Sequence, residues 1–426
     1  MLATLVNAWR TPELRTKLLF TAFILAVYRF GSFIPSPGVD SSALASSLAN
    51  QGGIYSLLSV FSGGGLSRLS LFALGIMPYI TASIILQVLT PVSTNLQALQ
   101  KEGELGQRRI TQYTRYLTVA LAALQGLGYT YAFHSGALGT SGTTGSLVTF
   151  NTGNVILVTM TLTVGATMLM WMGELVTQRG IGNGMSLLIF ASILTSAPAA
   201  INAWWNGSSF EKLSLPVVIF LIVLAVVYVQ EGIRKIPIQY AKRMVGRRMT
   251  SGGSTYLPLR INMAGVIPVI FAAAIMAFPA TIAQLMPFNV AHDMAAFFSP
   301  GGWPFLLGEA FLIFAFTFFY VAVVFNSIEQ ADNLKKAGGF IPGIRPGRPT
   351  AQYLESVLVR LTVAGGAFLA AVAVLPSLFI RYGGFSQATS RALGGTTVLI
   401  VVGVAIDTMR QIEAQLAQRS YQGFLK

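Results

Sequence analysis

The chain has 426 residues, of which 54% are hydrophobic and only 10% are charged. A soluble domain carries about 25% charged residues, so this composition excludes an ordinary soluble protein and favours a membrane protein. The net charge of +14 fits a nucleic-acid partner, an anionic membrane surface or loop charges that orient membrane spans. The chain contains no cysteine, which excludes disulfides and thiolate chemistry.

Ten apolar runs predict ten membrane-spanning helices, because about 20 apolar residues cross a bilayer core. The runs are Leu18 to Phe33, Leu69 to Leu89, Tyr116 to Phe133, Val155 to Gly173, Met185 to Trp205, Leu215 to Val229, Ile261 to Leu285, Pro304 to Phe325, Leu361 to Ile380 and Ala392 to Ile406. The first run could also be a signal peptide, but the cleavage-like Ala43-Leu44-Ala45 lies about ten residues beyond its end, which favours an uncleaved span.

Lysine and arginine gather on one side of these spans. If the N-terminus is cytosolic, the cytosolic segments hold 23 of the 28 basic residues and the outer loops hold four, while Arg29 lies near the outer end of the first span. This bias supports ten spans with both termini in the cytosol. Two cytosolic loops, Gln230 to Arg260 and Ser327 to Arg360, are long and basic.

Two pairs of spans share a sequence pattern. Gly75 to Ala82 aligns with Gly265 to Ala272, and Gly184 to Ile189 aligns more weakly with Gly395 to Ile400. The members of each pair are five positions apart in the order of spans, an odd number, so they run in opposite directions. This is typical of an inverted repeat with its site near the membrane midplane. A chance likeness between apolar helices remains an alternative at this point.

Prolines occupy equivalent positions in the first pair. Pro78 and Pro268 each remove a backbone donor, which predicts a kinked or weakened helix in both spans. Such a pair suits a moving element.

The segment Gly52 to Arg68 between the first two spans is apolar but too short to cross the bilayer, and it contains three consecutive glycines. Backbone of this kind lies at membrane depth only when it is buried in protein or lines a cavity. We therefore expect a re-entrant segment, with an external amphipathic helix as the alternative.

Ion-coupled transport and catalysis find little support in the residues. Ionisable groups in the spans, such as Glu174, Glu309 and Asp407, fall near span ends, which disfavours an ion-driven pump. Gly139 to Gly142 has the form of a nucleophile motif near His134, but it lies in a loop of low complexity without an orienting acid, and His292 is expected in another loop. A secondary transporter remains the main alternative function, and a membrane-embedded hydrolase is a weaker one.

Branched apolar side chains take the place of polar groups at the expected meeting point of the repeats. Ile76 and Ile80 lie one helical turn apart, and Ile189 and Ile193 do the same. A ring of such side chains would form a dry constriction that resists ions by dewetting.

Several runs of residues, in order along the chain, resemble the SecY family, the channel-forming subunits of the bacterial protein translocase. They are Phe61-Ser62-Gly63-Gly64, Leu66-Ser67-Arg68, Ala73 to Ile80, Gly180 to Gly184, Pro237 to Arg243, Asn262 to Pro268, Pro342 to Gly347 and Gly394-Gly395-Thr396. The resemblance implies an all-α polytopic membrane protein with ten transmembrane helices in two inverted five-helix halves, residues 1–210 and 211–426, around a central pore. It also implies a short re-entrant plug helix and a protein-conducting function.

The resemblance further implies roles for individual residues. The pore ring would be Ile76, Ile80, Ile189, Ile193, Ile270 and Ile400, and the plug, about residues 54–67, would include Ile54, Tyr55, Leu57, Leu58, Phe61, Gly63, Gly64 and Gly65. A lateral gate between spans 2 and 7 would involve Pro78, Pro268, Ile84 and Ile275. Docking of cytosolic partners would use Lys242, Arg243, Arg247, Arg248 and Arg345.

The implied partners are the SecE and SecG subunits, the SecA motor ATPase, the ribosome with its RNA, signal peptides, nascent polypeptides and the lipid bilayer. The implied location is the inner (plasma) membrane, with no cofactor, no metal and no enzymatic activity. The tail after Ile406 is shorter than in many members of the family, which leaves contacts of the tail with partners open.

Overall fold

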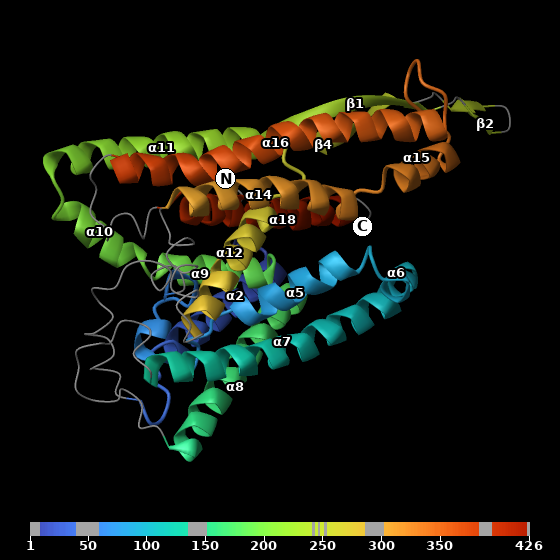
Figure 1. Ribbon diagram of the computed structural model, residues 1–426. Helices are drawn as coiled ribbons and strands as arrows, with labels where there is room; N and C mark the ends of the chain where they lie inside the picture. Colours follow the sequence, from blue (N-terminus) through green and yellow to red (C-terminus); the bar gives the residue numbers. More distant parts are fainter. Residues whose placement is uncertain are drawn as a thin grey trace.

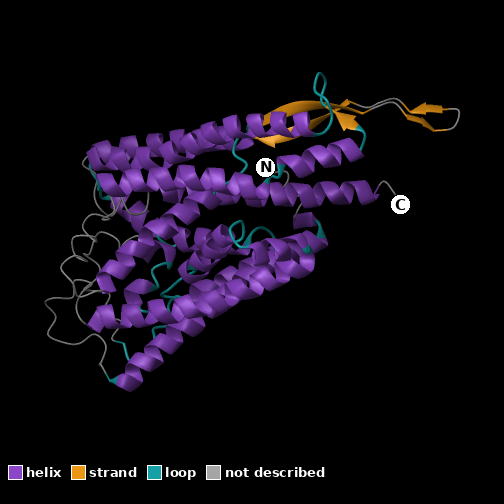
Figure 2. Cartoon of the chain, turned by 45° about the vertical axis from the view of Figure 1, so that its right-hand side comes forward, coloured by secondary structure: helices purple, strands orange, loops and turns teal. Residues whose placement is uncertain are grey.

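The computed structural model describes residues 9–39, 59–134, 151–240, 243–245, 248–250, 254–285, 302–382 and 394–423. These residues form a bundle of long helices with a small sheet that extends beyond one end (Figures 1 and 2). The mostly helical fold confirms the predicted fold class. The helices are α2 (Pro12–Gly31), η1 (Leu66–Arg68), α5 (Met77–Leu89), α6 (Thr94–Lys101), α7 (Glu104–His134), α8 (Thr152–Arg179), α9 (Gly184–Leu194), α10 (Ala197–Trp205), α11 (Ser209–Glu231), α12 (Ile267–Leu285), α14 (Trp303–Val324), α15 (Ser327–Lys336), α16 (Arg348–Tyr382) and α18 (Gly395–Gly423).

Each of the ten predicted spans contains a helix within the described residues. By length and composition, six of the described stretches are long and apolar enough to cross a membrane, and α5 and the described part of α12 are shorter apolar helices. The predicted span Met185 to Trp205 is two helices, α9 and α10, because the chain turns at Thr195 and Ser196 before Pro198 starts the second helix.

The two spans that contain the aligned prolines start later than predicted. Helix α5 begins at Met77 rather than Leu69, and α12 begins at Ile267 rather than Ile261. Pro78 and Pro268 are therefore each the second residue of their helix, where a missing N–H breaks no intrahelical hydrogen bond. The expected proline kink is wrong, since both prolines help to start a helix.

The helices form two groups. One group packs α2, α5, α7, α8 and α9 together, and the other packs α11, α14, α16 and α18 together, as the neighbouring rows in Figure 1 show. Helix α12 contacts α14 in the second group and α5 and α7 in the first. The largest buried apolar cluster contains side chains from both groups, so the core lies where the groups meet.

The two basic loops share one antiparallel sheet, which the sequence analysis did not predict. Strand β1 (Ile233–Tyr240) pairs with β4 (Ser254–Arg260) on one side and with β5 (Gly339–Phe340) on the other, while β2 (Arg243–Val245) and β3 (Arg248–Thr250) form a separate pair. Ile236 and Ile238 are buried while their neighbours are exposed, the alternation expected of a strand with one covered face. The sheet extends past the helices in Figure 2.

The start of α2 and the end of α18 lie side by side. Leu14 packs with Ile412 in a small apolar cluster, and the Lys17 ammonium donates to the Gln415 side-chain oxygen at 3.2 Å. Arg410 contacts both Gln230 and Glu231 at the end of α11, directly before the sheet. The start of α2 therefore lies beside the C-terminal half of α18, which in turn contacts the end of α11 before the sheet.

Candidate functional site

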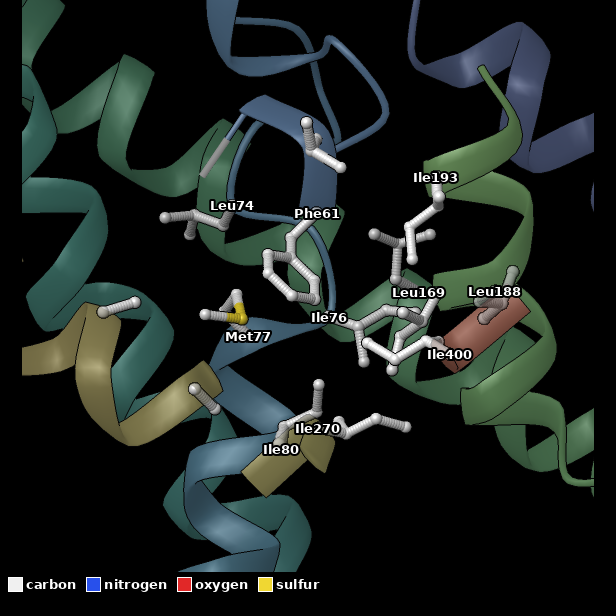
Figure 3. Close-up of a cluster of buried hydrophobic side chains, with 14 of the residues drawn as sticks. Phe61, Leu74, Ile76, Met77, Ile80, Leu169, Leu188, Ile193, Ile270 and Ile400 are labelled. Atoms are coloured by element: carbon white, nitrogen blue, oxygen red, sulfur yellow. The ribbon is translucent and has the colours of Figure 1, made fainter. Parts of the chain in front are cut away.

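Six isoleucines that are far apart in the sequence meet in the central core. Ile76, Ile80, Ile189, Ile193, Ile270 and Ile400 all belong to the largest buried cluster, and each is at most 5% exposed. They come from α5 and the turn before it and from α9, α12 and α18, so both groups of helices contribute. Figure 3 shows Ile76, Ile80, Ile270 and Ile400 gathered around one region, with Leu169 and Leu188 beside them.

The same local geometry places Ile80 and Ile270. Gly75 and Gly265 both have a left-handed backbone, with φ of +58° and +63°, three residues before the aligned proline. The amide of Ile80 then donates to the Ile76 carbonyl at 3.1 Å, and that of Ile270 donates to the Val266 carbonyl at 3.2 Å. The aligned sequences thus fold alike, and each brings an isoleucine two residues past its proline to the centre.

Glycines place the other pair of aligned helices. Gly184 starts α9 and Gly395 starts α18, and a Cβ added there would lie 1.9 Å from the Gly173 carbonyl oxygen and 2.2 Å from the Ala373 carbonyl oxygen. A side chain larger than hydrogen does not fit at either place. Ile189 and Ile400 lie five residues after these two glycines, again at equivalent positions.

The segment before α5 closes one side of the isoleucine cluster. We name residues 59–68 the plug segment; residues 59–61 are helical, the chain turns at Ser62 to Gly64, and η1 follows. Phe61 is 7% exposed, and its ring points toward Ile76, Ile80 and Ile270 in Figure 3. Ile54, Tyr55, Leu57 and Leu58, which were also predicted for this segment, lie outside the described residues.

Helices α2 and α9 hold the turn of the plug segment. The Arg29 guanidinium donates to the Gly63 carbonyl at 3.1 Å, and the Tyr28 hydroxyl lies 2.6 Å from the Ser192 hydroxyl. Gly63 has φ of +62°, and a Cβ there would lie 2.7 Å from the Tyr28 hydroxyl. Only glycine suits this backbone and this close approach, which explains why the turn contains glycine.

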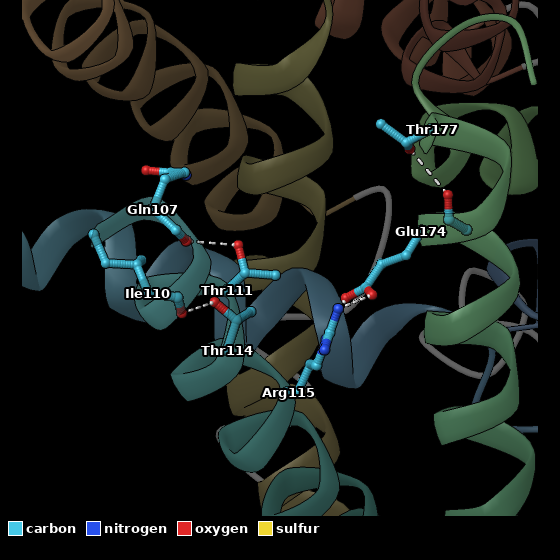
Figure 4. Close-up of polar contacts among 8 residues, drawn as sticks. Gln107, Ile110, Thr111, Thr114, Arg115, Glu174 and Thr177 are labelled. Carbon is cyan, nitrogen blue, oxygen red and sulfur yellow. Dashed lines mark hydrogen bonds and ion pairs between the residues drawn. The ribbon is translucent and has the colours of Figure 1, made fainter. Parts of the chain in front are cut away.

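On the other side of the cluster, an open cavity of about 420 Å³ leads toward the sheet end of the bundle. Its lining includes Ile80, Ile189 and Ile270 together with polar side chains of α5, α7 and α8. Arg115 on α7 forms a bidentate ion pair with Glu174 on α8, at 2.9 and 2.5 Å, in the wall of this cavity (Figure 4). An apolar constriction therefore lies between a polar cavity and the plug segment.

The helices of the predicted gate adjoin each other. Helix α5 packs against α12, and we call the line of contact between these two helices the seam. Pro78 and Ile84 are buried, and Ile275 is partly buried against the central cluster.

Of the basic residues predicted for docking, Arg345 has a described side chain, and it is exposed. Its loop is anchored because Ile341 and Ile344 pack into the apolar cluster under the sheet and the Thr350 hydroxyl donates to the Arg345 carbonyl at 2.9 Å. Arg243 lies on β2 and Arg248 on β3, whereas Lys242 and Arg247 lie outside the described residues.

Sequence reasoning missed several contacts of this site. Leu169, Leu188 and Met77 lie among the six isoleucines, and Tyr28, Arg29 and Ser192 hold the plug segment. Arg29 carried a signal, since a cation inside an apolar span calls for a partner. In the part of the chain that the structure describes, we find no group of three or more His, Asp or Glu side chains that could hold a metal ion.

Comparison with known proteins gives one consistent family. A family model described as SecY matches residues 70–409. The chain is 47% identical over 444 residues to protein translocase subunit SecY of Streptomyces griseus and 46% identical over 443 residues to that of Mycobacterium tuberculosis H37Rv, with all of both chains covered in each case.

Solved structures share the fold. "The structure of a protein conducting channel" matches with a TM-score of 0.66 at 18% identity and covers 93% of this chain and 91% of that one. A structure titled for the SecY plug domain, which "maintains a membrane seal", matches with a TM-score of 0.65 at 19% identity and the same coverage. Sec61 in the canine ribosome-channel complex matches with a TM-score of 0.62 at 17% identity, with coverage again of 93% and 91%.

Proposed function

The chain belongs to the SecY family and is a protein-conducting channel of the membrane, and we propose that unfolded polypeptides pass between its six central isoleucines. The observation that carries this proposal is the position of that cluster. It lies between an open polar cavity and the plug segment and takes side chains from both groups of helices. Branched apolar side chains exclude ions by dewetting, yet they can fold around a passing chain. The family assignment replaces the secondary transporter that the repeats alone had left open.

The plug segment closes the resting channel in this proposal. Phe61 covers the isoleucine cluster, and the glycine turn at Gly63 to Gly65 lets the segment fold back between α2 and α9. The hydrogen bond from Arg29 to the Gly63 carbonyl joins this turn to α2, and a polypeptide that enters from the cavity displaces the plug segment by breaking it.

Sideways release occurs at the seam between α5 and α12. Residues 1–210 and 211–426 act as two halves that separate there, and Pro78, Pro268, Ile84 and Ile275 line the opening. An apolar signal sequence settles in the open seam because lipid is a better solvent for it than water. Its higher affinity for the open state shifts the equilibrium from closed to open.

The driving force comes from partners, because the chain is a channel subunit and not an enzyme. We assign the SecA motor ATPase and the ribosome to the cytosolic surface formed by the sheet and the Arg345 loop. The solved structures of canine Sec61 and yeast Ssh1 with ribosomes support such a surface by analogy. SecE and SecG complete the complex, and the protein lies in the inner membrane with both termini in the cytosol, in accord with the distribution of basic residues.

A reconstituted translocation assay tests this function. Vesicles that contain the complex should import a secretory precursor when the motor ATPase and ATP are supplied. Arg345→Glu should lower the rate at least about tenfold, since reversing an exposed charge in a docking surface weakens a complementary contact by about 1.4 kcal/mol or more. The control Lys336→Glu reverses another exposed charge at the end of α15 and should leave the rate near that of the wild type. Absence of import by the wild type would refute the function, and equal rates in the two variants would refute the role of Arg345.

A further inference from the structure

A second cavity, of about 200 Å³, lies beside the plug segment at the end of the bundle opposite the sheet. The C-terminal turn of α2, the plug segment and the turn after α9 form its walls. Its lining includes Arg29, Phe33, Gly63, Ser67, Arg68 and Thr195. Val60 also lines the cavity and belongs to the central isoleucine cluster, whereas the six residues just named do not.

Two cations share this cavity. The guanidinium carbon of Arg29 lies 4.4 Å from the centre of the Phe33 ring, and that of Arg68 lies 5.0 Å from the same centre. Among the described residues, neither arginine forms an ion pair with a carboxylate. Two like charges held near one ring in a partly enclosed space repel each other, and an anion between them would relieve this repulsion.

The two arginines are the cationic hydrogen-bond donors among the lining residues. Ser67 donates its hydroxyl proton to the Gly64 carbonyl at 2.7 Å, and Thr195 donates its proton to the Ser192 carbonyl at 2.6 Å. Among the described residues, Arg29 donates one N–H group to the Gly63 carbonyl, and each guanidinium carries five N–H donors in one plane. The paired N–H groups of a guanidinium match the spacing of the oxygens of a phosphate group.

The surface beside the cavity is apolar. Phe30 and Ile34 are 72% and 44% exposed at the end of α2, next to Phe33. In a membrane-spanning chain this surface faces acyl chains near the outer interface. A phospholipid could thus place its phosphate on the arginines and its chains along Phe30 and Ile34.

From these contacts we infer that Arg29 and Arg68 form a binding site for a phosphate group, supplied in the membrane by a phospholipid headgroup. Because Arg29 also holds the Gly63 carbonyl, occupancy of the site stiffens the closed plug segment. The site needs only the membrane location and the closed segment, so it can fail without affecting the proposed transport function.

Lipid binding to the full chain with its partner subunits, purified in non-ionic detergent, tests the site. Native mass spectrometry with phosphatidylglycerol should show a bound lipid whose affinity falls at least about tenfold in Arg29→Gln and in Arg68→Gln, the loss expected for a charge-assisted bidentate contact. Lys212→Gln, which removes an exposed cation near the start of α11, should bind as the wild type does. If Arg29→Gln does not fold, Arg68→Gln, on an exposed side chain, still decides the result.

A second arm separates the two sources of phosphate. The thermal unfolding midpoint should be measured in inorganic phosphate and in chloride of equal ionic strength. A phosphate-specific rise that needs both arginines and is lost when lipid is bound supports the same site for both ligands. The proposal is overturned if the binding of neither ligand depends on the two arginines, or if Lys212→Gln loses as much affinity as the arginine variants do.

Discussion

Replacing Ile80 and Ile270 together with glycine should raise the ion conductance of the resting channel at least about tenfold. One side chain comes from α5 and the other from α12, and both are buried in the same cluster. Removing their branched carbons widens the constriction and makes it less costly to hydrate. A fall of about 1.4 kcal/mol in the barrier to ions gives a tenfold rise in rate. Single-channel recording in planar bilayers, without precursor or ATP, measures the conductance.

The matched control replaces two isoleucines that face away from the core. Ile156 on α8 and Ile201 on α10 are 55% and 59% exposed, and both lie in helices. Ile156→Gly with Ile201→Gly carries the same cost of glycine in a helix but leaves the constriction intact. A leak of similar size in both double variants would mean that general loosening of the bundle, and not the isoleucine cluster, controls the conductance.

Tethering α5 to α12 should reduce translocation to less than about a tenth of the wild-type rate. The chain contains no cysteine, so Ile84→Cys with Ile275→Cys provides the only two thiols. Ile84 lies on α5 and Ile275 on α12, the two helices that pack at the seam. A short bifunctional reagent that forms disulfides would keep the seam closed, and since a signal sequence acts by binding the open state, it could no longer shift the equilibrium. Dithiothreitol should restore the rate.

The control for the tether places both cysteines on one helix. Ile84→Cys with Gln87→Cys lie three residues apart on α5 and are neighbours on its surface. The same reagent should leave translocation by this variant nearly unchanged. Full activity of the tethered Ile84–Ile275 variant would show that the seam need not open.

The central cluster could be predicted because its signal is local and repeated. Gly75 and Pro78 occur at the same spacing as Gly265 and Pro268, and identical local geometry follows in the structure. Ile80 and Ile270 were therefore found at equivalent positions. The pattern alone could not show that these isoleucines meet, since most isoleucines in spans contact lipid or pack between helices. The structure shows it, because the isoleucines of α5, α9, α12 and α18 are buried in one cluster.

Other features depend on contacts between distant residues. Pairing of β1 with β5 joins two loops about 100 residues apart, although the alternation of Ile236 and Ile238 gave a sign of a strand. The late start of α5 agrees with the left-handed backbone of Gly75, which an α-helix does not contain, and with the hydrogen bond from the Leu71 amide to the Ile34 carbonyl, which holds the preceding turn against the end of α2. Hydropathy does not register such a bond, so the apolar run extended the predicted span to Leu69.

Crosslinking of a stalled polypeptide to the constriction tests the central claim most directly. Ile270→Cys should form a disulfide with a cysteine in a secretory chain halted during import into vesicles, and Ile156→Cys on the exposed face of α8 should not. A crosslink at Ile270 alone is the result that we predict. If the halted chain never reacts at Ile270 while a cysteine at the cytosolic surface does, the polypeptide does not pass between the isoleucines.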